Sequence, residues 1–511
     1  MSHVPSDQEL VRREALTKLR ALGIEPFPAD TFPVSHSAKQ VKEGFKEVGH
    51  APEGEQPPPN IVLAGRLMSV RVMGKASFAV LRDSTGDQQI YVNRDEICPE
   101  EDKTLYNDVF KKLLDLGDFI GVKGFMFLTK TGELTLHVKE LTLLAKALRP
   151  LPVVKTDEDG KVHDAFTDPE QRYRMRYVDL IVNPGVKETF LKRTRIFNAM
   201  REAFQLAGYL EVDTPVMQPI PGGAAARPFI THHNALDTQF YLRIANELYL
   251  KRLIVGGFDG VFEFSRNFRN EGMDRTHNPE FTVMELYVAY KDYHWMMDFI
   301  EGVFRNVATA ANGSPTSNFQ GKAIDFGQPF KRITMCGALQ EKTGVDVLNA
   351  DEATLGELAI KNGVEVTAAM GKGKLIDELF SELVQPELIQ PTFVMDFPLE
   401  MSPLCKKHRD DDRLTERFEL YVAGFEVGNA YSELNDPIDQ RERFEEQLKL
   451  MERGDDEAMF IDQDFLRALE YGMPPTSGIG IGMDRLVMLL TDNPAIQEVL
   501  LFPQMRPEKF D

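Results

Sequence analysis

The sequence predicts a multidomain α+β protein with a small β-barrel ahead of a much larger mixed domain. The chain has 511 residues, which is too long for a single ordinary hydrophobic core. Residues 61–148 contain five short runs rich in β-branched and aromatic residues, and residues 181–511 combine helical stripes with strand-like runs. We therefore expect an N-terminal helical extension and linker over residues 1–60, a barrel domain over 61–150, a connector over 151–180 and one large domain over 181–511.

The composition narrows the classes of function without naming one. Hydrophobic residues make up 42% and charged residues 27% of the chain, as expected for a soluble globular protein. No apolar run approaches the ~20 residues that cross a bilayer, and the N-terminus has no apolar signal core, so we expect a cytoplasmic protein without a membrane segment. The net charge of −21 argues against non-specific nucleic-acid binding but allows a locally basic surface.

The three cysteines, Cys98, Cys336 and Cys405, lie far apart in the sequence and lack the spacing of metal ligands. This fits a reducing compartment and argues against structural zinc. We expect Cys98 and Cys336 to act as small apolar fillers and the Cys405 thiol to be more exposed.

The strand-like runs have the order of an oligonucleotide-binding (OB) barrel. They are IVLAGRLMSVRV, ASFAVLRD, QQIYVNR, FIGVKGFMFLT and GELTLHVKELTLL, and a helical segment, TLYNDVFKKLLDL, lies between the third and the fourth. Five strands with one helix ahead of the fourth are typical of the OB fold, with another small β-barrel as the alternative. Upstream, residues 8–22 have the spacing of an amphipathic helix with Arg12 on its solvated face, and residues 51–60 are a proline-rich linker.

The large domain opens with a predicted helix that ends at Gly208. Its apolar positions at helical spacing are Val186, Phe190, Phe197, Met200, Ala203, Phe204 and Ala207. The next run, YLEVDTPVM, alternates like a strand, and Pro215 favours an edge or an interface over a central position. Alone, this segment is an ordinary core helix and strand.

A strand–loop–strand pattern over residues 260–290 carries the first candidate site residues. In the second strand one face carries Phe281, Val283, Glu285 and Tyr287, and the other carries Met284, Leu286 and Val288. The loop carries Arg269, Glu271, Arg275, His277 and Asn278. Arginine offers a planar fork for phosphate and Phe281 a stacking surface. The whole run favours a nucleotide site, although any one residue is better explained as an ordinary ion pair or core polar group.

Two further segments add charged groups. In TSGIGIGMDRLVMLLTD (476–492), glycines lighten a strand for close approach of a ligand, and Arg485 at the following helix would be a second cation beside the nucleotide. In ELYVAGFEVGNAYSEL (419–434), Ala423-Gly424 is a two-residue turn that pairs Tyr421 with Glu426. Glu419 and Glu426 then lie on one face about 7–8 Å apart. Such a pair fits Mg²⁺ shared with phosphate oxygens, or two solvent-facing acids.

The segment from about Arg332 to Gln390 is predicted to be helical. Its GKGK sequence (371–374) lacks the glycine spacing and the hydroxyl of a phosphate loop, so we expect an ordinary turn there.

Together these segments resemble a class II aminoacyl-tRNA synthetase, and within that class the lysyl-tRNA synthetases of the bacterial–eukaryotic type. The helix and strand with Pro215 are similar to the first motif of the class, FRNEGMDRTHNPEFTVMELY to the second and GIGIGMDR to the third. The sequence HNPEFT following RNEG resembles the form that this motif takes in the lysyl subgroup. The resemblance implies a catalytic domain built on an antiparallel β-sheet flanked by helices, a homodimer, and a barrel that reads the anticodon.

The resemblance also implies an activity, namely ATP-dependent activation of L-lysine to lysyl-adenylate with Mg²⁺ and transfer of lysine to the 3′ end of tRNA(Lys). The implied ATP-binding residues are Arg269, Glu271, His277, Asn278, Phe281, Glu419, Glu426 and Arg485. Among them, Arg269 and Arg485 are implied as catalytic, and Glu419 and Glu426 as metal ligands. The implied lysine-binding residues are Gly223, Glu247, Glu285, Tyr287, Asn429, Tyr431 and Glu433. The implied anticodon-binding residues are Phe78, Gln89 and Glu133.

The charge of the implied pocket indicates which amino acid it binds. An ammonium in a partly dry pocket must face acids, and we interpret Glu247 and Glu433 as partners of the two amino groups, with Glu285 acting through Tyr287. The sequence departs from the family at Asn246, where proline is usual, and at Tyr431, where phenylalanine is common. The alternatives are an aspartyl- or asparaginyl-tRNA ligase, in which an aspartate substrate would need a cation, and a non-catalytic tRNA-binding paralogue, which should have lost charged site residues.

Overall fold

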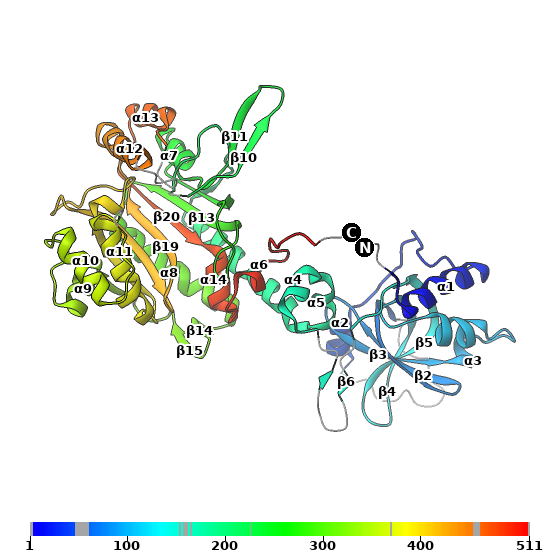
Figure 1. The fold of residues 1–511 in the computed structure, drawn as a ribbon. Coiled ribbons are helices and arrows are strands. Elements are labelled where there is room, and N and C mark those ends of the chain that lie inside the picture. Colours follow the sequence, from blue (N-terminus) through cyan, green and yellow to red (C-terminus); the bar gives the residue numbers. More distant parts are fainter. Residues whose placement is uncertain are drawn as a thin grey trace. The chain divides into compact units, whose positions relative to one another are not determined.

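The computed structural model describes residues 4–45, 61–152, 155–156, 162–163, 166–224, 226–367, 370–452 and 460–508. The chain forms two compact units (Figure 1): the barrel unit, Met1–Phe166 with Pro507–Asp511, and the sheet unit, Thr167–Arg506. The expected linker at 51–60 lies outside the described residues. Within the described part of the chain, no helix is both long and apolar enough to span a bilayer.

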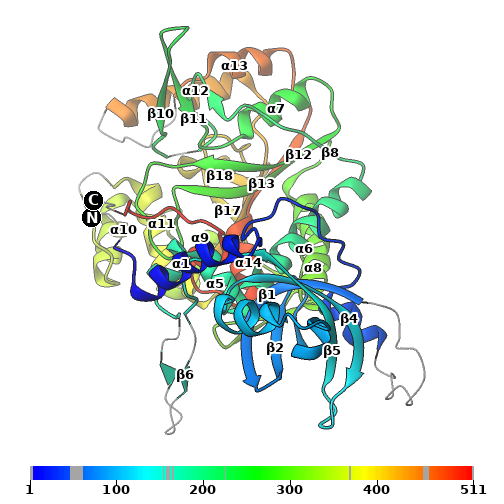
Figure 2. The ribbon, with the colours of Figure 1, turned by 90° about the vertical axis from the view of Figure 1, so that its right-hand side faces the viewer.

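In the barrel unit, five strands close a barrel in the order β1-β2-β3-β5-β4 (Figure 2). The strands are β1 (Ile61–Met73), β2 (Ala76–Arg82), β3 (Asp87–Asn93), β4 (Phe119–Leu128) and β5 (Leu134–Ala145). Every second side chain of β2 and β3 is buried in the barrel. A short helix α3 (Arg94–Ile97) and a π-helix (Leu105–Leu113) lie between β3 and β4. The predicted OB barrel is confirmed.

Among the described residues, helices α1 (Asp7–Ala21) and α2 (Ala38–Gly44) precede the barrel, and the short strands β6 (Lys155–Thr156) and β7 (Val162–His163) follow it. The helix expected over residues 8–22 is confirmed, but the solvated position expected for Arg12 is wrong. Arg12 is buried, and its guanidinium donates to the carbonyl oxygens of Leu116, Ala147 and Arg149. An arginine on the charged face of a helix is thus used to satisfy the carbonyl groups of barrel segments.

The sheet unit is built on eight strands in the order β16-β17-β18-β19-β20-β13-β12-β8. Their bounds are β8 (Leu210–Glu211), β12 (Gly260–Phe268), β13 (Glu280–Ala289), β16 (Lys331–Thr334), β17 (Thr392–Pro398), β18 (Leu414–Val422), β19 (Phe425–Ser432) and β20 (Thr476–Gly482). The six central strands are antiparallel, whereas β16 and β8 run parallel to β17 and β12. The antiparallel sheet flanked by helices is confirmed.

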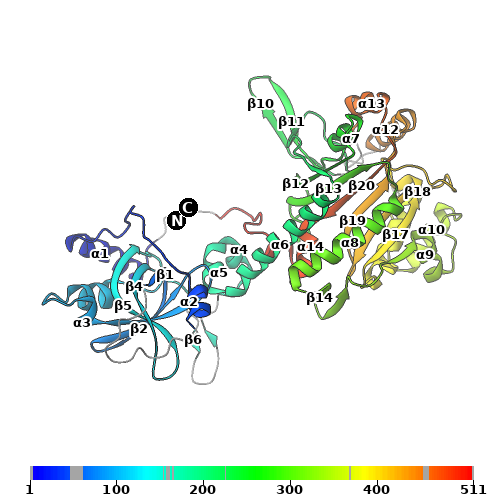
Figure 3. The same ribbon diagram turned by 180° about the vertical axis from the view of Figure 1, so that it is seen from behind.

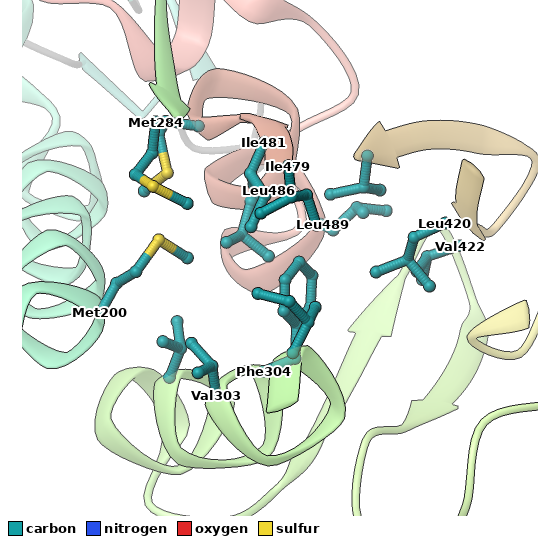
Figure 4. Close-up of a cluster of buried hydrophobic side chains, with 14 of the residues drawn as sticks. Met200, Met284, Val303, Phe304, Leu420, Val422, Ile479, Ile481, Leu486 and Leu489 are labelled. Carbon is teal, nitrogen blue, oxygen red and sulfur yellow. The ribbon is translucent and has the colours of Figure 1, made fainter. Parts of the chain in front are cut away.

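One face of this sheet is covered by helices α6 (Pro184–Leu206), α8 (Tyr293–Asn312) and α14 (Met483–Thr491) (Figure 3). Met200 of α6, Phe304 of α8 and Leu486 of α14 meet Met284 and Ile481 of the sheet in the main core (Figure 4). The apolar face predicted for β13 is therefore confirmed. The helix predicted to end at Gly208 is also confirmed, since α6 stops just before this residue, whose φ is 88°.

The sheet unit contains further elements outside the large sheet. Its further helices and helical turns are α4 (Pro169–Arg174), α5 (Arg176–Val182), α7 (Glu247–Val255), α9 (Met335–Thr343), α10 (Glu352–Lys361), α11 (Lys372–Leu383), η2 (Gln385–Glu387), η3 (Leu399–Met401), α12 (Pro437–Glu452), α13 (Gln463–Glu470) and α15 (Ile496–Val499). Its other strands are β9 (Met217–Gln218), β10 (Ile230–His233), β11 (Thr238–Leu242), β14 (Thr316–Phe319) and β15 (Lys322–Asp325). Figure 2 shows α7, α12 and α13 gathered at one end of the unit, where α13 packs on both α7 and α12.

Three expectations about local structure are wrong. YLEVDTPVM is not one strand: it leaves the large sheet after β8 and joins a separate sheet of order β10-β11-β9, with Pro215 between the two. GKGK is not a turn, because Gly371 is the N-cap of α11 and the next three residues form its first turn. Cys405 is buried rather than exposed, because its neighbourhood pairs with Glu433 as an isolated β-bridge.

Candidate active site

Two rows of residues cross the face of the sheet opposite the main core. Strand register aligns Glu285, Gly480, Asn429 and Glu419 in one row across β13, β20, β19 and β18. The neighbouring row contains Tyr287, Gly478, Tyr431 and Arg417. These residues line a cavity of about 560 Å³. Because β20 contributes glycines to both rows, the floor of the cavity is backbone, and polar side chains stand on either side of it.

Gly478 shows how close this approach is. A Cβ atom at this position would overlap the ring of Tyr287 and Oε1 of Glu433. No larger residue fits between them without moving one of the two. The space left by this glycine is therefore filled by two side chains of the protein, and close approach of a ligand to the strand stays a prediction.

The end of the cavity near α7 is acidic. Glu247 and Glu285 line it, and Glu433 lies behind them with a side chain that is 0% exposed. Oε2 of Glu285 accepts a hydrogen bond from the Tyr287 hydroxyl at 3.0 Å. Burial, reinforced by the charge of Glu247, raises the pKa of Glu285 to about 8. A cation bound at this end of the cavity would therefore favour the ionised form of Glu285.

A buried lysine lies within the acidic end. Nζ of Lys251, also 0% exposed, is 2.5 Å from Oε1 of Glu247 and 2.5 Å from Oε2 of Glu433. Burial lowers the pKa of Lys251, but the two carboxylates outweigh it and hold the pKa above its usual value. Lys251 therefore carries its charge.

The opposite end of the cavity carries cations and an aromatic surface. The Arg269 guanidinium lies over the Phe281 ring, 5.2 Å from its centroid, and Nε of Arg269 has no hydrogen-bond partner among the described residues. Arg485 donates from Nη1 to the Glu426 carbonyl oxygen at 2.8 Å, and its Nη2 lies 3.5 Å from Nε2 of His277. Fixed guanidinium groups beside a ring are suited to a nucleotide phosphate and base.

The predicted turn and the pairing of Tyr421 with Glu426 are confirmed, but the register shifts between Leu420 and Tyr421, so that Glu419 pairs with Asn429. Tyr421 pairs with Glu426, and the turn residues Ala423 and Gly424 both have positive φ, as a tight hairpin of this kind requires. Both Glu419 and Glu426 line the cavity, and both also line an adjoining cavity of about 740 Å³ that Lys374 of α11 borders.

The two glutamates differ in environment. Glu419 accepts hydrogen bonds from Arg417 (2.5 Å) and from the Tyr421 hydroxyl (2.6 Å), whereas the side chain of Glu426 is 39% exposed. Burial, opposed by Arg417 and aided by Glu426, raises the pKa of Glu419 to about 7. Among the described residues, no group of three or more His, Cys, Asp or Glu side chains could hold a metal. Two carboxylate oxygens whose repulsion a cation would relieve fit Mg²⁺ that completes its coordination with phosphate oxygens.

Most of the predicted site residues come together around this cavity. Those that line it are Gly223, Glu247, Arg269, Glu271, His277, Asn278, Phe281, Glu285, Tyr287, Glu419, Glu426, Asn429, Tyr431 and Arg485. Glu433 lies one layer deeper. Asn246, at the departure from the family, is buried and donates to Oε2 of Glu263 at 2.9 Å, so its amide is used within the fold.

The sequence reasoning missed Lys251 and Arg417. Arg417 contacts two predicted site residues, since it donates to Oδ1 of Asn429 at 3.1 Å and to Glu419. Each omission had a signal in the sequence. Lys251 follows Glu247 by four residues on a helix, and Arg417 precedes Glu419 by two on a strand, so each shares a face with a predicted acid.

The predicted anticodon residues lie in the barrel unit. Phe78 of β2 pairs with Tyr91 of β3, and their ring centroids are 5.1 Å apart. Gln89, on the same outer face, donates to Thr135 at 2.8 Å, and Glu133 is exposed just before β5. Tyr91, Phe125, Phe127 and His137 extend Phe78 into a half-buried aromatic cluster. The sequence reasoning did not single out these four rings.

Comparison with known protein families agrees with this architecture. The model of class II tRNA synthetases (D, K and N) matches residues 168–506, and that of the OB-fold nucleic acid binding domain matches residues 61–144. The chain belongs to the class II tRNA synthetases of the D, K and N group.

Within that group, its relatives include lysine–tRNA ligases. The enzyme of Christiangramia forsetii is 64% identical over 504 residues, which cover 99% of this chain and 87% of the relative. That of Porphyromonas gingivalis is 63% identical over 504 residues, with 99% and 86% covered. That of Azobacteroides pseudotrichonymphae is 60% identical over 506 residues, with 99% and 100% covered.

Proposed function

We propose that the chain activates L-lysine with ATP to form lysyl-adenylate and transfers the lysine to the 3′ end of tRNA(Lys). The observation that carries this proposal is the polarity of the cavity, with Glu247 and Glu285 at one end and Arg269 and Arg485 at the other. An acidic end suits a substrate with an ammonium side chain, and a cationic end suits a triphosphate. The names of the relatives support the same reaction.

The first step is attack of a lysine carboxylate oxygen on the α-phosphorus of ATP, with release of pyrophosphate. Arg269 and Arg485 orient the phosphates and neutralise the charge that develops on them, and Phe281 gives the adenine a surface for stacking. Glu271, His277 and Asn278 complete the nucleotide site from the loop between β12 and β13. Glu419 and Glu426 would hold Mg²⁺, which supplies further charge neutralisation at the phosphates when bound.

The second step is attack of the terminal adenosine hydroxyl of the tRNA on the lysyl-adenylate carbonyl. The ester to the tRNA forms, the bond between the carbonyl carbon and the phosphate oxygen breaks, and AMP and the hydroxyl proton leave, so the step needs no protein nucleophile. The outer face of the barrel with Phe78, Gln89 and Glu133 would bind the anticodon, because half-buried rings give unpaired bases a surface for stacking.

We further propose that the chain acts as a cytoplasmic homodimer. Support comes from the segment around Pro215, where Leu206, Leu210, Val216 and Met217 are exposed apolar side chains. Exposed apolar residues that gather in one segment are typical of an interface. Light scattering of the purified protein measures its mass directly, and a monomer at micromolar concentration contradicts the dimer.

The experiment that tests the proposed reaction is amino-acid-dependent exchange of pyrophosphate into ATP with lysine, aspartate and asparagine in turn. We expect exchange with lysine alone. An aspartate-specific site needs a cation where this cavity presents Glu247 and Glu285. Exchange with aspartate, or no exchange with any of the three, contradicts the proposal and favours a related ligase or a non-catalytic tRNA-binding paralogue.

A further inference from the structure

Lys251, the buried lysine of α7, lies in the acidic end of the cavity, and the proposed reaction gives it no role. Its ammonium group links two parts of the fold, because it forms ion pairs with Glu247 at the start of α7 and with Glu433 just after β19. Each carboxylate gives one oxygen to Lys251. Oε1 of Glu433 then remains without a hydrogen-bond partner among the described residues, and it faces Gly478 and Tyr287, which line the cavity.

The charges around Lys251 can be counted. Three carboxylates meet there, those of Glu247, Glu285 and Glu433, and Lys251 is the cation that pairs with Glu247 and Glu433. Arg269 also interacts with Glu285, but it lies at the phosphate end, where Glu271 and Glu426 offset its charge. The negative charge of the nearby Glu263 is balanced by Arg243 at 2.7 Å, and the positive charge of Arg417 is balanced by Glu419. The acidic end therefore carries three negative charges and one positive charge when its acids are ionised.

The other titratable groups that face these acids add no charge. They are Tyr287, Tyr431 and Cys405, and burial raises the pKa of each. The net charge of minus two matches the two ammonium groups of lysine, while the carboxylate of the substrate belongs at the phosphate end. A buried charge without a partner is costly, so an amino acid with a single ammonium leaves one acid uncompensated.

We propose that Lys251 is a positioning residue for the amino-acid substrate. It holds Glu247 and Glu433 in place, and it sets the negative charge of the acidic end so that it balances the two ammonium groups of an α,ω-diamino acid. This inference rests on the proposed function. Without Lys251, two neighbouring carboxylates would repel each other, and one would take up a proton. A substrate ammonium would then have to displace that proton before it could pair with the acid.

The test is isothermal titration of L-lysine into wild-type protein and Lys251→Met at pH 8.5 in two buffers of different ionisation enthalpy. The difference between buffers gives the protons released per lysine bound. We expect Lys251→Met to release up to about one proton more than wild type, with a dissociation constant raised about tenfold for each unit by which the carboxylate pKa rises above the pH. A merely structural role would change affinity or thermal stability but not the proton count.

Lys146→Met is the matched control. Lys146 is also 0% exposed and also lies between two carboxylates, Asp115 and Asp118, but in the barrel unit. The Lys146→Met variant should be less stable than wild type but should bind lysine with the same affinity and release the same number of protons. Should Lys251→Met not fold, Lys251→Gln keeps two hydrogen-bond donors without the charge and should show the same extra proton.

Two results overturn the inference in different ways. If a folded neutral variant binds lysine within twofold of wild type and releases the same number of protons, Lys251 does not set the charge, and the proposed function stands. If the wild-type protein binds no lysine and supports no lysine-dependent exchange, the proposed function fails and takes this inference with it.

Discussion

Lysine affinity should depend on pH through Glu285. Burial and the neighbouring Glu247 raise its pKa to about 8, so the side chain is largely protonated in the free protein at neutral pH. A bound ammonium favours the ionised form and lowers this pKa. Binding therefore releases a proton, and affinity must rise with pH as long as Glu285 is protonated in the free state and ionised in the complex.

The expected size follows from the fraction that is ionised. With a pKa of about 8, about half of the Glu285 carboxylate is ionised at pH 8 and about one part in a hundred at pH 6. The dissociation constant for lysine should then be about 50-fold larger at pH 6 than at pH 8. Burial also raises the pKa of Glu433, which can only steepen the dependence.

The assay is calorimetric titration of lysine without ATP from pH 6 to 8, where the ε-amino group of the ligand stays protonated. Glu285→Gln keeps the shape of the side chain and its contact with Tyr287 but removes this ionisation, so its dependence on pH should be weaker. A wild-type dissociation constant that stays constant within twofold across this range would refute the reasoning, because it would mean that no buried acid gains or loses a proton on binding.

Four other changes test separate parts of the account. Arg269→Ala should lower lysine-dependent pyrophosphate exchange about 10²–10³-fold, since it removes a fixed cation at the phosphates, whereas the half-exposed Arg195→Ala should not; near-normal exchange would disprove the role. Glu419→Gln should raise the Mg²⁺ concentration for half-maximal exchange about tenfold, and an unchanged magnesium titration would exclude it as a ligand. Gly478→Ala should cost about 1–3 kcal/mol of unfolding free energy in urea and weaken lysine binding, and wild-type values for both would contradict the packing at Tyr287. Phe78→Ala should weaken tRNA binding by about 1–3 kcal/mol and leave exchange intact, with the exposed Phe27→Ala as control; a loss of exchange instead would point to misfolding.

The parts of the fold that could be predicted are those fixed by local periodicity. The alternation of residues 281–288 separates the core face of β13 from the cavity face, and the turn at Ala423-Gly424 sets the pairing of Tyr421 with Glu426. Both follow from the two-residue period of a strand and from the positive φ of a tight turn. The barrel strands could be located from the same two-residue period, and the helix that ends at Gly208 could be located from the helical spacing of its apolar residues.

What could not be predicted depends on contacts between segments far apart in the chain. Lys251 became part of the site only because Glu433, 182 positions later, folds back onto α7. Arg12 is buried because carbonyl groups of the barrel need its guanidinium. YLEVDTPVM has the alternation of a single strand, yet it is divided between two sheets. Local alternation does not show with which strand a residue pairs, so this division could not be predicted.

The charges that line this cavity imply that lysine binds with its ammonium groups among buried carboxylates and that ATP binds against Arg269 and Arg485. A crystal structure with L-lysine and a non-hydrolysable ATP analogue tests it most directly. The ε-nitrogen should lie within hydrogen-bond distance of at least one carboxylate of Glu247, Glu285 or Glu433, and the α-phosphate should lie against Arg269. A ligand bound with its ε-nitrogen turned away from all three acids would contradict it.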